Sequence, residues 1–364
     1  MSHMPIIAHQ SSQTRRFALA LGALGIAALL LSGCSAAPEG ETWSSPAVGE
    51  NTVYYGSHDA RLVAVDVATG QMRWEFPANS TPSLGSLYAT PTVSEDTVYV
   101  GGYNQGLYAV NAANGSQRWE FRTNGPIIGS AALADNLVIV GSSDHRVYAV
   151  DAANGSERWR FETQRSVWST PVVADRTVYV PSLDRHLYAL DTSTGQERWR
   201  FNAEAALLGT PTVAGDALYV GGMGNKLYAL DAQTGQKLWD FTAGNWFWDK
   251  PLVLTDTVYA ASLDRSLYAL DRATGQQRWS FQVDGLVRGG PELVGGSIIV
   301  AADDGNVYAL QPDSGALAWQ YSTGGRIHAA PTVSDHRIYV NVDKGPLLAL
   351  DAETRSVAWR FDKK

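Results

Sequence analysis

The fold is decided by residues 187–201, which read Leu-Tyr-Ala-Leu-Asp-Thr-Ser-Thr-Gly-Gln-Glu-Arg-Trp-Arg-Phe. This phrase occurs eight times, and its tryptophans are Trp74, Trp119, Trp159, Trp199, Trp239, Trp279, Trp319 and Trp359. Neighbouring tryptophans are separated by 45 residues once and by 40 residues thereafter. A fixed period of about 40 residues indicates a repeat architecture, so one structural unit must account for all eight copies.

Each copy predicts four short antiparallel strands. Leu187–Leu190 is a short apolar run without helical periodicity. Asp191 and Gly195 bracket a turn, because an Asp side chain binds backbone amides further along and Gly adopts a positive φ at no steric cost. Trp199 and Phe201 are two residues apart and share one face of the following strand. Two further strand candidates precede this hairpin, at 170–173 and 177–180.

Eight such sheets predict an all-β, eight-bladed β-propeller over residues 43–361, with four antiparallel strands per blade. The apolar run Val178–Val180 makes both faces of the sheet apolar, so each sheet needs a neighbour on each side. An open solenoid would need distinct polar caps, whereas the first and last copies keep the full apolar pattern. Small residues introduce the first strand of each copy, which favours placing it at the axis and the Trp-bearing strand outermost.

The repeated tryptophans and Asp/Asn-x-x-x-Gly turns are interpreted as scaffold, because a residue present in every copy serves the fold. The last two copies depart from the turn pattern, at Gln311 and Arg355. The Asn-Gly-Ser triplets at Asn114 and Asn154 fall in these turns and are interpreted as turn chemistry. Blades one and eight are expected to abut without exchanging a strand. The extra five residues are placed in a loop within 77–87, and residues 362–364 are expected to fray.

Residues 1–33 are predicted to be a lipoprotein signal peptide. Arg15 and Arg16 precede a 15-residue apolar run over 17–31, which is shorter than the roughly 20 residues of a membrane-spanning helix. Leu31-Ser-Gly-Cys34 resembles the bacterial lipobox, which implies cleavage before Cys34 and lipidation there. A plain signal peptide and twin-arginine export are the alternatives. Residues 34–42 are then the lipidated cysteine and a short tether.

Composition excludes some partners. The net charge is −8, and since residues 1–34 carry two arginines and no acidic residue, the remainder carries −10. This argues against nucleic-acid binding and against polybasic membrane binding. Cys34 is the sole cysteine, so no internal disulfide can form. We expect a monomeric propeller held at the bacterial cell envelope, on the periplasmic side of a membrane or at the cell surface.

Candidate binding residues lie on the end of the ring that carries the blade-to-blade connections, where the copies vary. Three positions before the recurring proline, the copies read Trp43, Tyr88, Ile128, Trp168, Leu208, Trp248, Arg288 and His328. Aromatic residues and Arg are frequent anchors of binding surfaces. The other interpretation is that these aromatics plug the channel or pack between blades. The candidate binding surface is therefore Trp43, Tyr88, Trp168, Trp246, Trp248, Asp249, Lys250, Arg288 and His328.

No catalytic or metal site is predicted. His58, His145 and His186 fall in loops of three different copies and at different positions of the repeat, so they are not expected to converge on a metal. Asp249 beside Lys250 is interpreted as an ion pair rather than as a general base. No Ser/His/Asp order, phosphate-cradling loop or paired-carboxylate motif stands out.

The repeat Val-Tyr-Val…Leu-Tyr-Ala-Leu-Asp-x-x-Thr-Gly-x-x-x-Trp-x-Phe resembles the pyrroloquinoline-quinone (PQQ) type of propeller repeat over about 320 residues. One branch of that family, the quinoprotein dehydrogenases, implies PQQ with Ca²⁺ over the axis. Lys250 and Arg288 could then contact a quinone carboxylate, but the adjacent cysteine pair of many such enzymes is missing. The other branch is the lipoprotein propeller of the outer-membrane β-barrel assembly machinery, which this chain resembles in size, blade number and lipobox.

Three functions follow from the sequence. The preferred one is a non-catalytic, lipid-anchored interaction scaffold without a cofactor, whose partners are envelope or outer-membrane proteins. The alternatives are a PQQ-dependent quinoprotein dehydrogenase and a propeller that binds a glycan or another small molecule at the same mouth. The sequence names neither the partner nor the membrane that holds the anchor.

Overall fold

The computed structural model describes residues 42–78 and 81–363. The chain divides into two units, residues 1–37 and 38–364, and every described residue belongs to the second. The predicted signal peptide, Cys34 and the tether up to residue 41 lie outside the described residues. Within the described ranges, no helix is long and apolar enough to cross a membrane.

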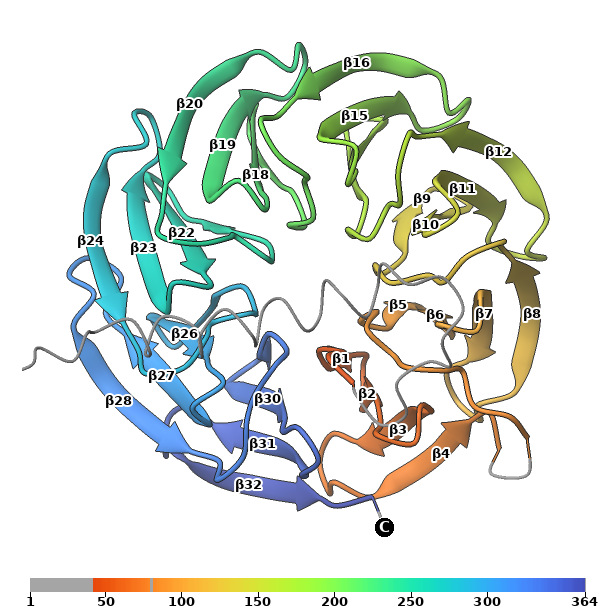
Figure 1. Cartoon of the computed structure of the whole chain (residues 1–364). Helices are drawn as coiled ribbons and strands as arrows, with labels where there is room; N and C mark the ends of the chain where they lie inside the picture. The colour runs from red at the N-terminus through yellow and green to blue at the C-terminus, as the bar shows by residue number, and fades with distance from the viewer. Residues whose placement is uncertain (1–41, 79–80, 364) are drawn as a thin grey trace, which may run out of the picture. The chain divides into compact units, whose positions relative to one another are not determined.

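The described unit is a ring of eight four-stranded antiparallel sheets, each built from four consecutive strands (Figure 1). This confirms the predicted eight-bladed β-propeller. We number the blades 1 to 8 in chain order, so that β1–β4 form blade 1 and β29–β32 form blade 8. The first strand of each blade lies toward the axis and the fourth on the outer wall, as the small residues and the Trp-Phe pairs predict.

The strands occupy equivalent positions in every blade. The innermost strands are β1 (Ala47–Val48), β5 (Thr92–Ser94), β9 (Ala132–Ala134), β13 (Val172–Ala174), β17 (Thr212–Ala214), β21 (Leu252–Val253), β25 (Glu292–Val294) and β29 (Thr332–Ser334). The second strands are β2 (Thr52–Gly56), β6 (Thr97–Gly101), β10 (Leu137–Ser142), β14 (Thr177–Pro181), β18 (Ala217–Gly221), β22 (Thr257–Ser262), β26 (Ser297–Ala301) and β30 (Arg337–Asn341). The third strands are β3 (Leu62–Asp66), β7 (Gly106–Asn111), β11 (Arg146–Asp151), β15 (His186–Asp191), β19 (Lys226–Asp231), β23 (Ser266–Asp271), β27 (Asn306–Leu310) and β31 (Leu347–Asp351). The outer strands are β4 (Met72–Phe76), β8 (Gln117–Arg122), β12 (Glu157–Glu162), β16 (Glu197–Asn202), β20 (Lys237–Thr242), β24 (Gln277–Gln282), β28 (Leu317–Ser322) and β32 (Ser356–Phe361).

The hydrophobic core is divided into layers that lie between neighbouring blades. One layer joins Val147 and Trp159 of blade 3 to Val178 and Tyr188 of blade 4. The second and third strands are buried along nearly their whole length, because both of their faces meet a neighbouring sheet. Burial of apolar surface stabilises by about 25 cal/mol per Å², so a blade gains most of its stability from its two neighbours.

The repeated tryptophan joins each blade to the next. In blade 5, Trp239 Nε1 donates a hydrogen bond to the carbonyl of Arg272 in blade 6, over 3.0 Å. Its ring covers Gly275, which has φ of +72° and where a Cβ would lie 2.6 Å from Trp239 Cε3. Equivalent indole hydrogen bonds come from Trp74, Trp119, Trp159, Trp279 and Trp359. The tryptophans and turn glycines are therefore scaffold, as predicted.

The Asp turns form as predicted. Asp191 Oδ1 accepts hydrogen bonds from the amides of Ser193 and Thr194, over 3.0 and 3.1 Å. In the Asn-Gly-Ser triplet at Asn114, the Asn side chain accepts from Ser116 inside the turn, over 2.8 Å. The final copy closes its turn with Arg355 at a φ of +59°, in place of the usual glycine.

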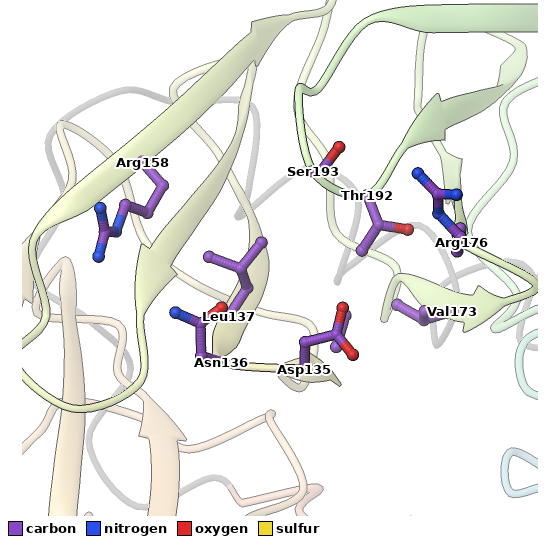
Figure 2. Close-up of a pocket in the computed structure, with 9 residues that line it drawn as sticks. Asp135, Asn136, Leu137, Arg158, Val173, Arg176, Thr192 and Ser193 are labelled. Atoms are coloured by element: carbon purple, nitrogen blue, oxygen red, sulfur yellow. The ribbon is translucent and has the colours of Figure 1, made fainter.

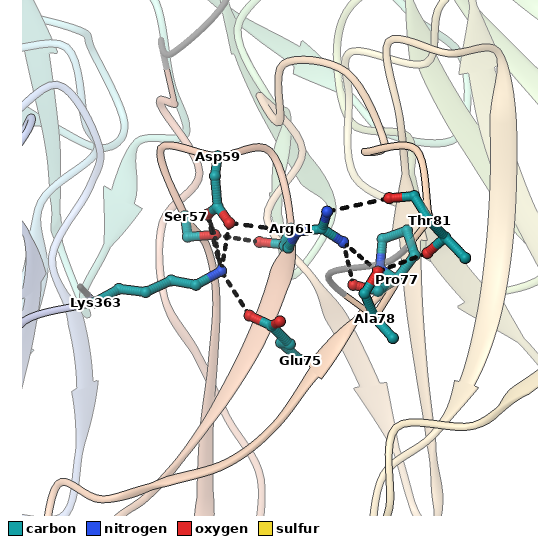
Figure 3. Close-up of polar contacts among 8 residues, drawn as sticks. All are labelled: Ser57, Asp59, Arg61, Glu75, Pro77, Ala78, Thr81 and Lys363. Atoms are coloured by element: carbon teal, nitrogen blue, oxygen red, sulfur yellow. Dashed lines mark hydrogen bonds and ion pairs between the residues drawn. The ribbon is translucent and has the colours of Figure 1, made fainter.

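Blades 1 and 8 abut without exchanging a strand, which confirms the prediction. Across this seam, Trp359 Nε1 donates to the carbonyl of Val67 over 2.7 Å, and Thr332 Oγ1 donates to the carbonyl of Pro46 over 2.6 Å. The expectation of a frayed end was wrong for Lys363. Its ammonium contacts Asp59 at 2.7 Å and Glu75 at 2.8 Å, both in blade 1 (Figure 3).

The longer connection between blades 1 and 2 is held by Arg61, which is buried. Its guanidinium donates to the carbonyls of Pro77, Ala78 and Thr81 (Figure 3). The same arginine contacts Asp59 at 3.3 Å, so one carboxylate links this connection to Lys363. The five extra residues lie in the predicted loop, and it is anchored to the first blade.

Candidate functional site

The two ends of the ring differ because the strands of each blade alternate in direction. At one end of the ring, which we call the hairpin-turn end, lie the turns that join the first strand to the second and the third strand to the fourth in every blade. At the other end, the loop end, lie the loops that join the second strand to the third and the connections between blades. Trp43 lies at the loop end, directly before β1, where its amide donates to the carbonyl of Leu87 in the next blade, over 3.3 Å.

Trp43 is the centre of an aromatic cluster at the loop end of the axis. Its ring contacts Tyr88, Trp248 and His328 at centroid distances of 5.6, 6.0 and 5.7 Å, all in edge-to-face geometry. Arg288 places its guanidinium carbon 5.2 Å from the same ring centroid, which is within the range of a cation–π contact. One side chain from blade 1 thereby meets blades 2, 6, 7 and 8. We call these five residues, together with Trp246, the axial cluster.

Blade 6 extends the cluster. Trp246 and Trp248 stack with their planes 17° apart and their centroids 6.5 Å apart. Asp249 accepts the amide of Gly290 in blade 7 over 2.8 Å, so it ties two blades together. The expected ion pair between Asp249 and Lys250 is replaced by one between Lys250 and Glu292, over 2.8 Å. Burial alone would lower the pKa of Lys250, but the charge and hydrogen bond of Glu292 raise it.

A buried carboxylate links the two basic members of the cluster. Asp303, in the loop before β27, lies 3.2 Å from Arg288 Nε and 3.8 Å from His328 Nε2. Burial raises the pKa of Asp303, although Arg288 and His328 act in the opposite direction. Burial lowers the pKa of His328, against the attraction of Asp303 and Asp343. The lowered pKa favours the neutral form of His328, and Arg288 carries a positive charge beside it.

Two polar atoms in the cluster lack hydrogen-bond partners. They are Trp43 Nε1 and His328 Nδ1, both buried and unpartnered among the described residues. An unpaired buried polar atom costs about 1–3 kcal/mol, so such atoms commonly mark a place where water or a ligand binds. The rings themselves remain partly exposed. The cluster therefore offers apolar surface, a cation and unsatisfied hydrogen-bonding groups at one point.

Not all of the predicted surface converges. Trp168 lies apart from the axial cluster and donates its indole hydrogen bond to Ser143 Oγ over 3.0 Å. The predicted convergence is thus found for Trp43, Tyr88, Trp248, Arg288 and His328.

The loop histidines do not form a metal site among the described residues, where no group of three or more His, Cys, Asp or Glu could hold an ion. His186 Nδ1 lies 3.2 Å from Asp184, while His58 has a buried and unpartnered Nδ1 within the described chain. These histidines belong to separate blades.

The sequence analysis did not identify a second set of residues at the loop end of the ring. In each blade, this residue lies four positions before the first apolar residue of the third strand. Asp303 occupies this position, and so do Tyr103, which contacts Tyr88, and Ser143, which binds Trp168. The remaining copies carry His58, Leu183, Met223, Leu263 and Asp343. Variation at one fixed position of a regular repeat was the signal that could have found them.

An eight-bladed ring built on this Trp-centred repeat is a β-propeller of the PQQ type. The chain belongs to the family described as the beta-propeller of the beta-alanine-activating enzyme, whose model matches residues 43–262, more than half of the sequence. A second family model, described as outer membrane protein assembly factor BamB, matches residues 284–364. No curated protein matches the chain significantly.

Solved structures share the fold. BamB from Moraxella catarrhalis is 24% identical, with a TM-score of 0.71 over 82% of this chain and 91% of that one. The computationally designed Ika8 protein is 16% identical, with a TM-score of 0.75 over 87% and 98%. The quinohemoprotein alcohol dehydrogenase ADHIIG from Pseudomonas putida HK5 is 16% identical, with a TM-score of 0.69 over 85% and 70%. These likenesses include a non-enzymatic propeller and an enzyme, so they define the fold and not the activity.

Two residues considered for PQQ are engaged within this chain. Arg288 and Lys250 were the candidates for a quinone carboxylate, yet each already pairs with a carboxylate, Asp303 and Glu292. Calcium takes six to eight oxygen ligands, largely from carboxylates, and no group of three or more His, Cys, Asp or Glu among the described residues could hold a metal ion.

Proposed function

We propose that the protein is a non-catalytic, lipid-anchored scaffold of the bacterial envelope that binds protein partners through the axial cluster. The observation that carries this proposal is Trp43, whose ring gathers residues of four other blades while its indole nitrogen is left unpaired. A purely structural plug would be expected to satisfy its buried polar atoms.

The composition of the cluster supports a protein partner. Trp, Tyr and Arg dominate the binding energy of protein interfaces, mostly near the centre of the contact. The axial cluster supplies three tryptophans, one tyrosine and one arginine, all partly exposed at one end of a rigid ring. A partner's carboxylate could approach Arg288 beside Asp303.

The anchor supports an envelope location. Acylation of Cys34 would contribute about 0.8 kcal/mol per buried CH₂ and hold the protein stably at a membrane. The tether of residues 35–42 spans at most roughly 28 Å when extended, so partners would be proteins at the same membrane. The BamB family model and the fold of Moraxella catarrhalis BamB support an assembly-factor-like role with outer-membrane proteins as partners.

The proposal is tested by replacing two members of the cluster, Trp248→Ala with Arg288→Ala, in the tagged full-length chain in its own host. Partners are captured after crosslinking and identified by mass spectrometry. We expect the double variant to lose its outer-membrane assembly partners at least tenfold, since two hot-spot residues are each typically worth more than 1 kcal/mol. Thermal unfolding should remain cooperative and well above the temperature of the capture, so that lost binding is not due to unfolding.

The control is Leu238→Ala on the outer wall, an exposed residue far from the mouth, which should leave capture unchanged. If the double variant captures the same partners as the parent chain, the axial cluster is not the binding surface. If outer-membrane assembly proteins are never captured by the parent chain, the assembly role is wrong.

The quinoprotein alternative has a separate test. Purified protein is incubated with PQQ and Ca²⁺, passed through a desalting column and examined by absorbance and by dye reduction with alcohols. We expect no retained chromophore and no dye reduction, because Arg288 and Lys250 are already paired. A stoichiometric chromophore with dye reduction would replace the scaffold proposal by an oxidoreductase.

A further inference from the structure

The groove between blades 3 and 4 opens on the hairpin-turn end, opposite the axial cluster. It encloses a cavity of about 420 Å³. Asp135, Leu137 and Arg158 of blade 3 line one side of it (Figure 2). Val173, Arg176 and Thr192 of blade 4 line the other (Figure 2).

Two departures from the repeat occur at the interface that holds this cavity. Six blades carry a tyrosine in the second strand, whereas blade 3 carries Ile139, which packs in the layer between blades 3 and 4. In the neighbouring groove, Tyr179 donates its hydroxyl hydrogen bond to the carbonyl of Ala232 over 3.0 Å. Ile139 is shorter and has no hydroxyl, so it cannot make the equivalent hydrogen bond to the carbonyl of Thr192, which Trp159 binds.

The second departure is Leu137, which stands where four blades carry threonine. In blade 4, that threonine is Thr177, whose Oγ1 accepts from Arg198 over 2.8 Å. Among the described residues, Arg158, the counterpart of Arg198, has no such acceptor and pairs with Asp151 at 2.5 Å. The hydrogen bond between Thr177 and Arg198 therefore has no counterpart in blade 3.

Thr192 places an unsatisfied hydrogen-bonding group beside the cavity. It is only 5% exposed, and its Oγ1 is buried without a partner among the described residues. Four other blades carry alanine at this position, so the fold does not need the hydroxyl. Its carbonyl is already bound by Trp159 over 2.8 Å, which leaves the side chain as the unsatisfied group.

The charges of the groove favour an anion with a neighbouring donor. No ion pair or side-chain hydrogen bond within the described residues holds the guanidinium of Arg176, and about half of the Arg158 side chain is exposed. Arg176 and the Thr192 hydroxyl can donate to a carboxylate, whereas Arg158 is already paired with Asp151. Asp135 is an exposed hydrogen-bond acceptor at the turn between β9 and β10. It could accept from an amide N–H of the ligand that lies close to the ligand's carboxylate.

We propose that this groove binds an acidic amino-acid residue, with its carboxylate held by Arg176 and Thr192 and an adjacent amide N–H directed to Asp135. The apolar side chains of Leu137 and Val173 would contact the methylene groups of the residue. The same chemistry is offered by a free blocked amino acid and by a glutamate within a peptide.

The test uses two probes, N-acetyl-glutamate amide and the peptide acetyl-Gly-Glu-Gly-amide, with their glutamine counterparts as controls. Binding to the purified chain is titrated by ligand-observed NMR at low salt. We expect saturable binding of at least one glutamate probe and at least tenfold weaker binding of its glutamine counterpart. Binding of the small probe indicates a free metabolite as the source, and binding of the peptide alone indicates a protein segment.

Variants locate the site. Thr192→Ala should weaken binding about tenfold, the value of one hydrogen bond to a charged group. Ile139→Tyr should abolish binding, because it introduces at this interface the larger side chain that six other blades carry. Ile299→Tyr, the same change at the equivalent position of blade 7, is the matched control and should leave the affinity unchanged.

Two results would overturn the proposal. One is that neither glutamate probe binds saturably, in which case the groove holds water only. The other is that binding survives both Thr192→Ala and Ile139→Tyr, or falls equally in Ile299→Tyr. Should Ile139→Tyr fail to fold, Thr192→Ala decides alone, since alanine already stands there in blades 2, 3, 5 and 8.

Discussion

Trp239 and Trp248 lie nine residues apart in the chain, yet they have different roles. Trp239 is 8% exposed, donates its indole hydrogen bond to the next blade and covers Gly275. Trp248 is partly exposed, and its ring contacts within the described part of the chain are with Trp43 and Trp246. The first recurs in every copy and the second does not. In this molecule, repetition identifies the tryptophans that hold blades together, and its absence identifies those available for binding.

The largest expected difference between the two is in stability. Trp239→Ala should lower the free energy of unfolding by about 3–5 kcal/mol, as is usual for a buried aromatic residue. Trp248→Ala should cost about 1 kcal/mol, because its ring is partly exposed. Urea unfolding followed by far-ultraviolet circular dichroism measures both. Equal losses would show that Trp248 is also a scaffold residue.

The turn beneath Trp239 gives a second contrast. Gly275→Ala should cost about 2–4 kcal/mol, because a Cβ adds to an unfavourable positive φ a clash with the Trp239 ring. Gly295 also has a positive φ, of +54°, but a Cβ there would meet nothing within 4 Å. Gly295→Ala should therefore cost only about 1 kcal/mol. Thermal unfolding of the two variants separates the cost of the clash with Trp239 from the cost of a positive φ. Equal losses of stability in the two variants would show that the clash contributes nothing.

The smallest predicted effect concerns pH at the hairpin-turn end. The hydrogen bond from Arg278, with those of Thr274, lowers the pKa of Asp271 to about 2. Its unfolded pKa is about 3.9. Since the folded value is the lower one, the stabilisation is present above about pH 4 and is lost as the pH falls toward 2.

Asp271→Asn tests this dependence. Asparagine can keep the turn bonds, as Asn111 does in blade 2, but it cannot pair with Arg278. The variant should be less stable than the parent chain at pH 7, and the difference should shrink steadily as the pH falls from 4 toward 2. Unfolding midpoints between pH 7 and 2 measure it. A difference as large at pH 2 as at pH 7 would mean that the charge is not responsible.

Much of the fold was predictable because each blade repeats the same solution. Trp199, Asp191 and Gly195 each recur with the period, so one copy predicted the hairpin and eight copies predicted the ring. Lys363 was missed because it has no counterpart in other repeats, and its partners Asp59 and Glu75 lie roughly 300 residues earlier. A contact made once, between the ends of the chain, leaves no periodic signal.

The candidate site was predictable only in part. The position that leads into each blade predicted the convergence on Trp43, since eight equivalent positions must surround one axis. It could not predict that Trp43 would reach across to Trp248 while Trp168 turned to Ser143, because side-chain direction depends on local packing. The groove between blades 3 and 4 lies at the end expected to be purely structural. Its signal was the isoleucine at 139 where tyrosine is usual.

The seam between blades 1 and 8 has a consequence for how the chain can be cut. It is closed by the same indole-to-carbonyl hydrogen bond that joins other blades, with no strand shared across it. The C-terminal residues also lie beside blade 1, through the contact of Lys363 with Asp59. New ends could therefore be opened at another blade boundary, and the old ones joined by a short linker, with the circle of sheets retained.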